Sequence, residues 1–148
     1  MSETDFRHQF RDQMSPFGQV QAIESPIESG IPDLCVSLRF PNWPIDRAVT
    51  TWIELKFARE WPKLAKTKLK FKHYTKEQKL WLLGWHAEGG NCCLIAKVAS
   101  EYFLVPPAHL RELQEEGMTR QRFVETSAVH SHMFPRSAFL KWLVKWKS

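Results

Sequence analysis

The chain has 148 residues, a length that favours one domain with a single sizeable core. Hydrophobic residues make up 43% and charged residues 25%, fractions that exclude a disordered or fibrous protein. The longest apolar stretches are far shorter than the roughly 18 residues of a membrane helix. The N-terminus is also unlike a signal peptide, so we expect a cytoplasmic protein with no membrane partner. The 21 basic and 16 acidic residues give a net charge of +5, which indicates an anionic partner without choosing between DNA, RNA and an acidic protein.

The first expected element is a helix over residues 2–14, in which Phe6, Phe10 and Met14 recur at a spacing of four. Ser2 and Asp5 have the spacing of a capping box at its start. The residues after Ser15 break the helix, and the alternation of polar and apolar residues over 19–23 predicts a short strand. The prolines and glycine of residues 24–32 predict a turn.

Two strands with strict two-residue alternation follow, over residues 33–38 and 52–57. The apolar face of the second strand carries Ile53, Leu55 and Phe57, and its other face carries Trp52, Glu54 and Lys56. The segment between the strands, residues 40–50, contains two prolines that cannot continue a ladder. The simplest connection is a loop, and the two strands then form an antiparallel hairpin.

Residues 59–72 have no apolar period and predict a mobile basic loop that carries Lys63, Lys66, Lys68, Lys70 and Lys72. Thr75 and Gln78 form a capping-box pattern, followed at helical spacing by Leu80, Leu83 and Ala87. This helix should end at the glycine pair of residues 89–90.

The remaining expected elements are strands over 91–98 and 102–105, a helix over 107–116 and a final amphipathic helix over 135–147. Residues 119–134 have no pattern that predicts a structure. The three cysteines cannot all pair, and Cys92 and Cys93 on one strand would face opposite sides, so we expect no disulfide framework. The pattern as a whole predicts one α/β domain over 1–148, with a mixed sheet between helices. Its core spans about residues 19–105, with a C-terminal helical extension over about 106–148.

The proposed hairpin brings charged residues to one end of the sheet. Residues that face each other across an antiparallel pair have numbers of constant sum, here about 88 to 90, which places Asp33 opposite residues 55 to 57. Glu54 and Lys56 lie on one face, roughly 7 Å apart along the strand. Carboxylates on a buried sheet are costly unless they are paired or bind a cation, and two hard oxygen ligands suit Mg²⁺. Such an ion could activate water and neutralise charge in phosphoryl chemistry, with Lys56 orienting the nucleophile or stabilising the phosphate.

These residues carry a resemblance to a known family. Gly30-Ile31-Pro32-Asp33, followed by Glu54-Leu55-Lys56, resembles the signature of the PD-(D/E)XK nucleases. It is most similar to the virus-type replication-repair (VRR-NUC) branch found in phages and bacteria, and to the related Holliday-junction resolvases. The resemblance extends from about Gln19 to Val98 and implies a restriction-endonuclease-like core. It further implies a Mg²⁺- or Mn²⁺-dependent endonuclease that acts on branched DNA as a homodimer, in the host cytoplasm if the gene belongs to a phage.

The resemblance also implies site residues. Asp33 and Glu54 match the metal-binding acids, Lys56 matches the motif lysine, and Gln78 matches a glutamine that points toward the metal in relatives. Glu24 matches the acid that precedes the Gly-x-Pro-Asp turn in phage members. Resolvases instead take an early acid from the first helix, so Asp12 or Glu28 are alternatives to Glu24. The loop between Asp33 and Glu54 is longer than in compact resolvases and carries Trp43, a departure from the family pattern.

Several alternatives stay open. A sequence-specific homing or restriction endonuclease, or a catalytically silent DNA-binding relative, would share the motif. The lysines of residues 63–72 suit contacts with the DNA backbone or a solvated face. His130 and His132 could join Cys92 or Cys93 in a zinc site, but their spacing matches no standard pattern and favours surface or core histidines. The stripe of Phe139, Trp142 and Trp146 suits the core, a dimer interface or DNA stacking.

Overall fold

The computed structural model describes residues 1–24, 29–39 and 48–145. Within these residues the strands are β1 (Gly18–Ala22), β2 (Leu34–Leu38), β3 (Val49–Ala58), β4 (Cys92–Val98), β5 (Glu101–Val105) and β6 (Val129–Ser131). The α-helices are α1 (Glu3–Met14), α2 (Lys76–Ala87), α3 (Leu110–Glu115), α4 (Arg120–Thr126) and α5 (Arg136–Lys145). Two 3₁₀ turns, η1 (Ser15–Phe17) and η2 (Pro107–His109), complete these elements.

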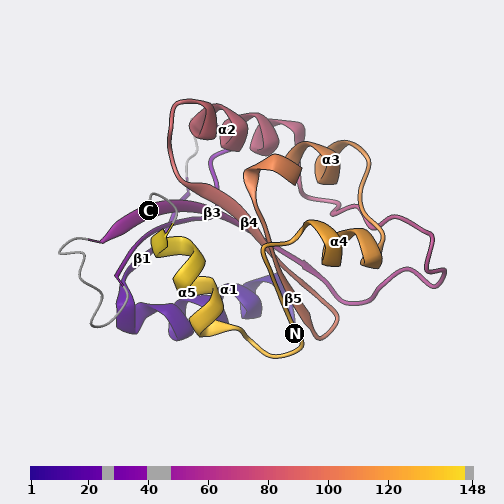
Figure 1. The fold of residues 1–148 in the computed structure, drawn as a ribbon, viewed down its shortest axis with the longest axis horizontal. Helices are drawn as coiled ribbons and strands as arrows, with labels where there is room; N and C mark the ends of the chain where they lie inside the picture. Colours follow the sequence, from indigo (N-terminus) through magenta and orange to yellow (C-terminus); the bar gives the residue numbers. More distant parts are fainter. Residues whose placement is uncertain (25–28, 40–47, 146–148) are drawn as a thin grey trace.

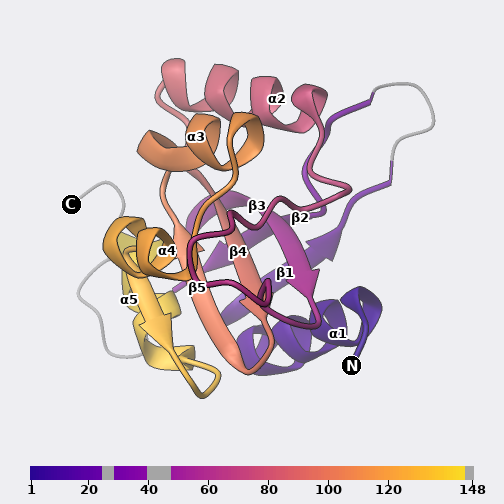
Figure 2. The ribbon, with the colours of Figure 1, turned by 90° about the vertical axis from the view of Figure 1, so that its right-hand side faces the viewer.

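The strands form one six-stranded mixed sheet in the order β1-β2-β3-β4-β5-β6. Neighbouring strands are antiparallel except β3 and β4, which run parallel because α2 connects them as a crossover. Figures 1 and 2 show α1 and α5 on one face of the sheet, and α2 and α3 on the other. The predicted α/β architecture, a mixed sheet flanked by helices, is therefore confirmed.

Each face of the sheet has its own hydrophobic core. The first core packs Phe6 and Phe10 of α1 and Phe139 of α5 against Leu55 and Cys93 of the sheet. The second core packs residues from α2, α3 and α4 against the other face, with members that include Cys92, Leu82, Leu113 and Phe123. Cys92 and Cys93 thus face opposite sides, and all three cysteines are free thiols in the described part of the chain. The predicted absence of a disulfide framework is confirmed.

Local sequence signals set the ends of the two long helices. Ser2 caps α1 and Thr75 caps α2, each through a complete capping box with Asp5 and Gln78 respectively. The buried face of α2 differs from the predicted one, since Leu82 and Lys79 are buried and Leu80 is 50% exposed. The reason is the tryptophans of α2: Trp81 packs on Trp52 of β3 with ring centroids 5.0 Å apart, which turns Leu80 outward.

The hairpin of β2 and β3 forms as predicted, but its register differs. Leu34 pairs with Ile53, so the constant sum is 87, and continuing the ladder by one residue puts Asp33 opposite Glu54 rather than residues 55 to 57. The cause is that β3 begins at Val49, where β-branched residues favour an extended backbone. The predicted loop was therefore too long at its C-terminal end, and the rest of it, residues 40–47 with Trp43, lies outside the described residues.

The segment that gave no pattern, residues 119–134, contains α4 and the edge strand β6. Both are short, and a three-residue strand leaves too few positions for a period to be recognised. The final helix, α5, packs Phe139 and Leu143 into the first core, while Trp146 lies outside the described residues. Phe139 and Trp142 of the predicted stripe therefore pack on the chain's own sheet, which is the simplest of the interpretations given above. None of the described helices is long and apolar enough to cross a membrane.

Candidate active site

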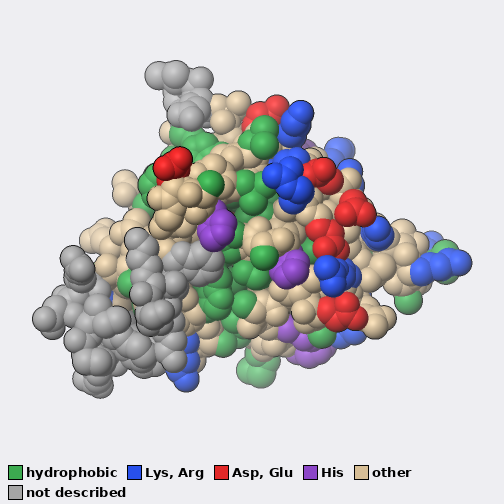
Figure 3. All heavy atoms as spheres, turned by 45° about the horizontal axis from the view of Figure 1, so that its top comes forward, with side chains coloured by type: hydrophobic (Ala, Val, Ile, Leu, Met, Phe, Trp, Pro, Cys, Tyr) green, Lys and Arg blue, Asp and Glu red, His purple; other side chains and the backbone are tan. Residues whose placement is uncertain are grey.

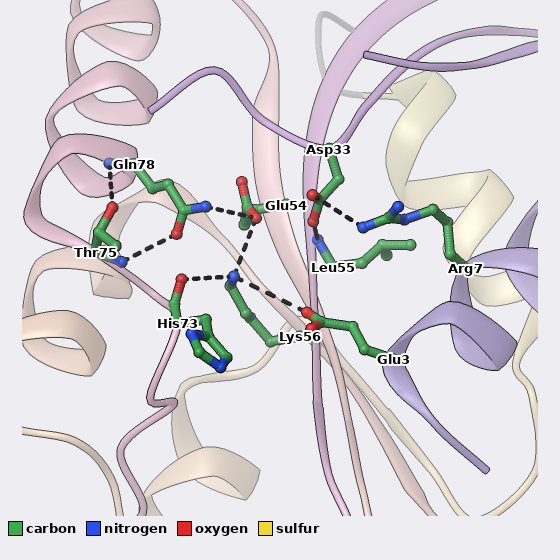
Figure 4. Close-up of polar contacts among 9 residues, drawn as sticks. All are labelled: Glu3, Arg7, Asp33, Glu54, Leu55, Lys56, His73, Thr75 and Gln78. Carbon is green, nitrogen blue, oxygen red and sulfur yellow. Dashed lines mark hydrogen bonds and ion pairs between the residues drawn. The ribbon is translucent and has the colours of Figure 1, made fainter. Parts of the chain in front are cut away.

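The predicted acids and lysine lie together at the junction of β2, β3 and α2 (Figure 4). Asp33 immediately precedes β2, and Glu54 and Lys56 lie on the face of β3 that looks toward α2. Gly30, with φ of +88°, lets the turn before Asp33 approach α2, because a Cβ there would meet the carbonyl oxygen of Glu77 at 2.7 Å. The glycine of the motif thus fixes Asp33 beside the start of α2.

Glu54 is the most buried member of the group, with 0% of its surface exposed. Its Oε1 accepts a hydrogen bond from Gln78 Nε2 at 3.2 Å and lies 3.2 Å from Lys56 Nζ. Its Oε2 is buried and has no hydrogen-bond partner within the described residues. Burial, followed by contact with the Asp33 carboxylate, raises the pKa of Glu54 to about 9, against the lowering effect of Lys56. Without a further cation, Glu54 therefore holds a proton at neutral pH.

Asp33 faces the opposite side of the cluster, where α1 approaches the sheet. Its Oδ2 accepts a hydrogen bond from the Leu55 backbone N–H at 3.0 Å, and its Oδ1 accepts one from Arg7 Nη2 at 3.3 Å. The backbone bond fixes the orientation of the carboxylate. Arg7 offsets part of the negative charge that Asp33 and Glu54 bring together.

Lys56 is held from several sides. Its Nζ donates to the backbone carbonyl oxygen of His73 at 2.9 Å, and Glu3 Oε1 of α1 lies 4.0 Å away. Only 5% of its side chain is exposed, so the ammonium has a fixed position between Glu54 and the segment that precedes α2.

Gln78 makes two separate side-chain hydrogen bonds. Its Oε1 accepts from the Thr75 backbone N–H at 3.0 Å as part of the capping box, while its Nε2 donates to Glu54. The start of α2 is thereby tied to the buried carboxylate (Figure 4).

The donor set fits a divalent cation. The orphaned Oε2 of Glu54 is a buried acceptor, and the neighbouring Asp33 is a second carboxylate that is 20% exposed and so open to solvent on one side. Hard oxygen ligands of this kind, with room for water, are what Mg²⁺ and Mn²⁺ prefer. A cation there would replace the proton that Glu54 otherwise holds.

The structure describes two of the three expected early acids, and both are exposed. Glu24 is exposed beyond the end of β1, Asp12 is exposed on α1, and Glu28 lies outside the described residues. The acid that α1 does bring toward the site is Glu3, together with Arg7. The available signal was their spacing: Glu3 and Arg7 each precede a buried phenylalanine by three positions, so they flank the face of α1 that packs on the sheet.

The basic segment, residues 59–72, is irregular as predicted, and both its ends are attached to the body of the protein. Trp61 Nε1 donates to Glu101 at 2.7 Å, and Leu69 forms a two-way backbone bridge with Met118. Figure 1 shows the segment projecting from the fold, and Figure 3 shows Lys and Arg side chains at its tip. The lysines Lys63, Lys66, Lys68, Lys70 and Lys72 are all exposed, and the segment leads directly to His73 beside Lys56.

The histidines do not join the cysteines. His130 Nε2 lies 2.9 Å from Glu101 Oε1 and its ring stacks on Phe103, whereas Cys92 is buried on β4 and donates to the Leu82 carbonyl. The hydrogen bonds of Arg120 to Glu101, above all, lower the pKa of that carboxyl to about 2. No zinc site with Cys92 or Cys93 forms among the described residues; Glu101, His130 and His132 cluster instead.

Comparison with known proteins finds similarity at the level of structure. No family model matches the chain, and no curated protein matches it in sequence. Its fold is similar to that of Hjc from Archaeoglobus fulgidus, a Holliday junction resolvase from an archaeal hyperthermophile, with a TM-score of 0.54 and 12% identity. The match covers 93% of this chain and 98% of Hjc. The expected resolvase-like fold is therefore confirmed, at the level of the fold.

Proposed function

We propose that the protein is a metal-dependent endonuclease that hydrolyses phosphodiester bonds in branched DNA. The observation that carries the proposal is the fully buried Glu54, whose Oε2 has no partner in the described structure and whose carboxylate lies beside Asp33. Burying a carboxyl group beside a second one is costly, and a fold without a use for this arrangement would have no physical reason to keep it. That the residues lie on the fold of Hjc, a Holliday junction resolvase, supports the nuclease assignment.

Asp33 and Glu54 would hold Mg²⁺ or Mn²⁺, which supplies a Lewis acid for the phosphate and an acidic bound water. Lys56, fixed by Glu54 and the His73 carbonyl, is placed to donate to a phosphate oxygen as negative charge develops. Gln78 keeps the Glu54 carboxylate oriented through its hydrogen bond. The roles of ligand, electrostatic stabiliser and positioning residue thus fall to different side chains.

Glu3 is our candidate for the early acid, in place of Glu24, Asp12 or Glu28. Its Oε1 lies 4.0 Å from Lys56 Nζ, and its side chain is 36% exposed, so it can reach a ligand from solvent. A third carboxylate would orient water at the metal or add a ligand to it.

The branched substrate and the dimer belong to the same proposal. The exposed lysines between residues 63 and 72 lead from solvent to the Lys56 side of the cluster and suit contacts with DNA phosphates. A four-way junction has two equivalent strands, and a two-fold dimer presents two equivalent sites to them. We therefore infer a homodimer that contacts the arms of the junction through its basic segments.

The proposal is tested by incubating the purified protein with a labelled four-way junction or with its separate linear arms, in Mg²⁺ or in chelator. Cleavage of the junction in Mg²⁺, with little cleavage of the arms, is the expected result. Equal cleavage of the junction and of the arms would contradict the selectivity for branched DNA, although the protein would still be a nuclease. No cleavage of either substrate in Mg²⁺ or Mn²⁺ would contradict the nuclease itself.

A further inference from the structure

A second group of metal-binding side chains lies away from the candidate nuclease site, where β5 meets β6. Phe103 pairs with His130 and Tyr102 pairs with Ser131, so continuing the ladder by one residue puts Glu101 opposite His132. His130 and His132 are two positions apart on an extended segment and therefore point to the same side. The strand pairing itself thus brings one carboxylate and two imidazoles together.

The distances within the group suit one ion. Glu101 Oε1 lies 2.9 Å from His130 Nε2 and 3.6 Å from His132 Nε2, and the three ligand atoms lie within 4.8 Å of one another. Ligand atoms of a tetrahedral zinc ion are roughly 3.3 Å apart. The two carboxylate-to-imidazole distances lie on either side of that value. Of the three side chains, that of His132 has the most room to shift toward an ion, since 66% of it is exposed.

The surroundings hold the ligands in place. Glu101 Oε2 accepts from Trp61 Nε1 at 2.7 Å and from Arg120 Nε at 2.9 Å, and the His130 ring stacks on Phe103 with centroids 4.7 Å apart. Orienting partners of this kind accompany metal ligands in proteins. Arg120 also donates to Oε1, through Nη2 at 2.6 Å and through Nε at 3.1 Å, so metal binding requires Oε1 to exchange these bonds for the ion while Oε2 keeps its two donors.

We propose that Glu101, His130 and His132 form a zinc site, distinct from the candidate nuclease centre, in which these three ligands leave the fourth tetrahedral position to water. Two imidazoles and a carboxylate favour Zn²⁺ over Mg²⁺, whereas the two carboxylates of Asp33 and Glu54 favour Mg²⁺. The ion would join the edge strand β6 to β5 and, through Trp61, to the first residues of the basic segment. Zinc then stabilises the region from which the basic segment projects.

The test measures zinc binding by the full chain in the background of the double substitution Asp33→Asn and Glu54→Gln, which removes the other metal site. Isothermal titration with Zn²⁺ gives stoichiometry and affinity, and visible absorption with Co²⁺ reports tetrahedral nitrogen and oxygen ligation. His132→Gln is the informative variant because its exposed side chain is not needed for folding. His8→Gln, an exposed histidine on α1, is the matched control.

We expect one Zn²⁺ per chain, a Co²⁺ spectrum of tetrahedral type and a rise in Tm with zinc. His132→Gln should weaken binding by about tenfold or more and remove the rise in Tm, while His8→Gln changes neither. Absence of zinc binding in the background protein would overturn the proposal. Zinc binding that is unchanged in the His132→Gln variant would also overturn the proposal.

Discussion

Gln78 donates a hydrogen bond from its Nε2 to Glu54 Oε1 while its own Oε1 closes the capping box of α2. One side chain thereby sets where the helix begins and which way a buried carboxylate points. The first residues of α2 and the centre of β3 are consequently held as a unit, and a change at either residue acts on both.

The raised pKa of Glu54 predicts how stability depends on pH in the absence of metal. The folded state keeps the Glu54 proton up to a pKa of about 9, whereas the unfolded chain releases it near the ordinary glutamate pKa of 4.5. The stabilising contribution is therefore complete below pH 4.5 and is lost as the pH rises toward 9. Glu54→Gln, which cannot ionise, should be more stable than the wild type by about 3 kcal/mol at pH 7, because each pH unit above 4.5 costs the wild type about 1.4 kcal/mol.

Urea unfolding in chelator, at several values between pH 5 and 9, measures this difference. Glu77→Gln, an exposed acid at the start of α2, is the control and should stay within about 0.5 kcal/mol of the wild type. A difference between Glu54→Gln and the wild type that does not grow with pH would show that Glu54 is ionised in the folded protein.

Glu3→Gln should reduce Mg²⁺-dependent cleavage by about tenfold or more, because it removes the carboxylate of α1 that faces Lys56. Asp12→Asn, on the same helix but exposed, should leave the rate unchanged. Single-turnover rates at saturating enzyme provide the measurement. A loss of rate in Asp12→Asn with none in Glu3→Gln would restore Asp12 as the early acid.

Replacing Lys63, Lys66 and Lys68 by glutamine should weaken DNA binding and reduce its salt dependence. Each phosphate contact with duplex DNA contributes roughly −0.9 to the slope of log K against log salt concentration. The slope should therefore become less steep by up to about 2.7 if all three lysines contact phosphates. Fluorescence anisotropy between low and moderate salt measures it, and an unchanged slope and affinity would identify the segment as a solvated face.

The proposed dimer predicts a mass of about 35 kDa in solution, twice the 17.4 kDa of the chain. Light scattering at low micromolar concentration, with and without a four-way junction, measures it. A monomer that still cuts both opposing strands of a junction in one encounter would contradict the two-site arrangement.

The parts of the fold that the sequence predicts are those with a repeated local signal. The apolar spacing of α1, the alternation of β2 and β3 and the two capping boxes each extend over enough residues to be recognised. The predicted register of the hairpin was wrong because the β-branched residues at the start of β3 extend this strand beyond its predicted N-terminal boundary. Strand β6 was missed because three residues carry no period.

The candidate site likewise has residues that a local sequence signal predicts and residues that it does not. Asp33, Glu54 and Lys56 converge because they lie on adjacent strands, which alternation alone predicts. Glu3 and the His73 carbonyl join them only through packing between distant segments, and no local pattern encodes that contact. The pairing of Glu101 with His132 likewise depends on the unrecognised strand β6.

The proposal that Asp33 and Glu54 hold the metal for DNA cleavage is tested by measuring how fast the Asp33→Asn variant cuts a labelled four-way junction. Asparagine keeps the size of the side chain and removes the charge of one proposed metal ligand. We expect a folded variant that still binds the junction but cuts it at least about a hundredfold more slowly than the wild type in Mg²⁺. Cleavage at the wild-type rate would show that the metal site lies elsewhere.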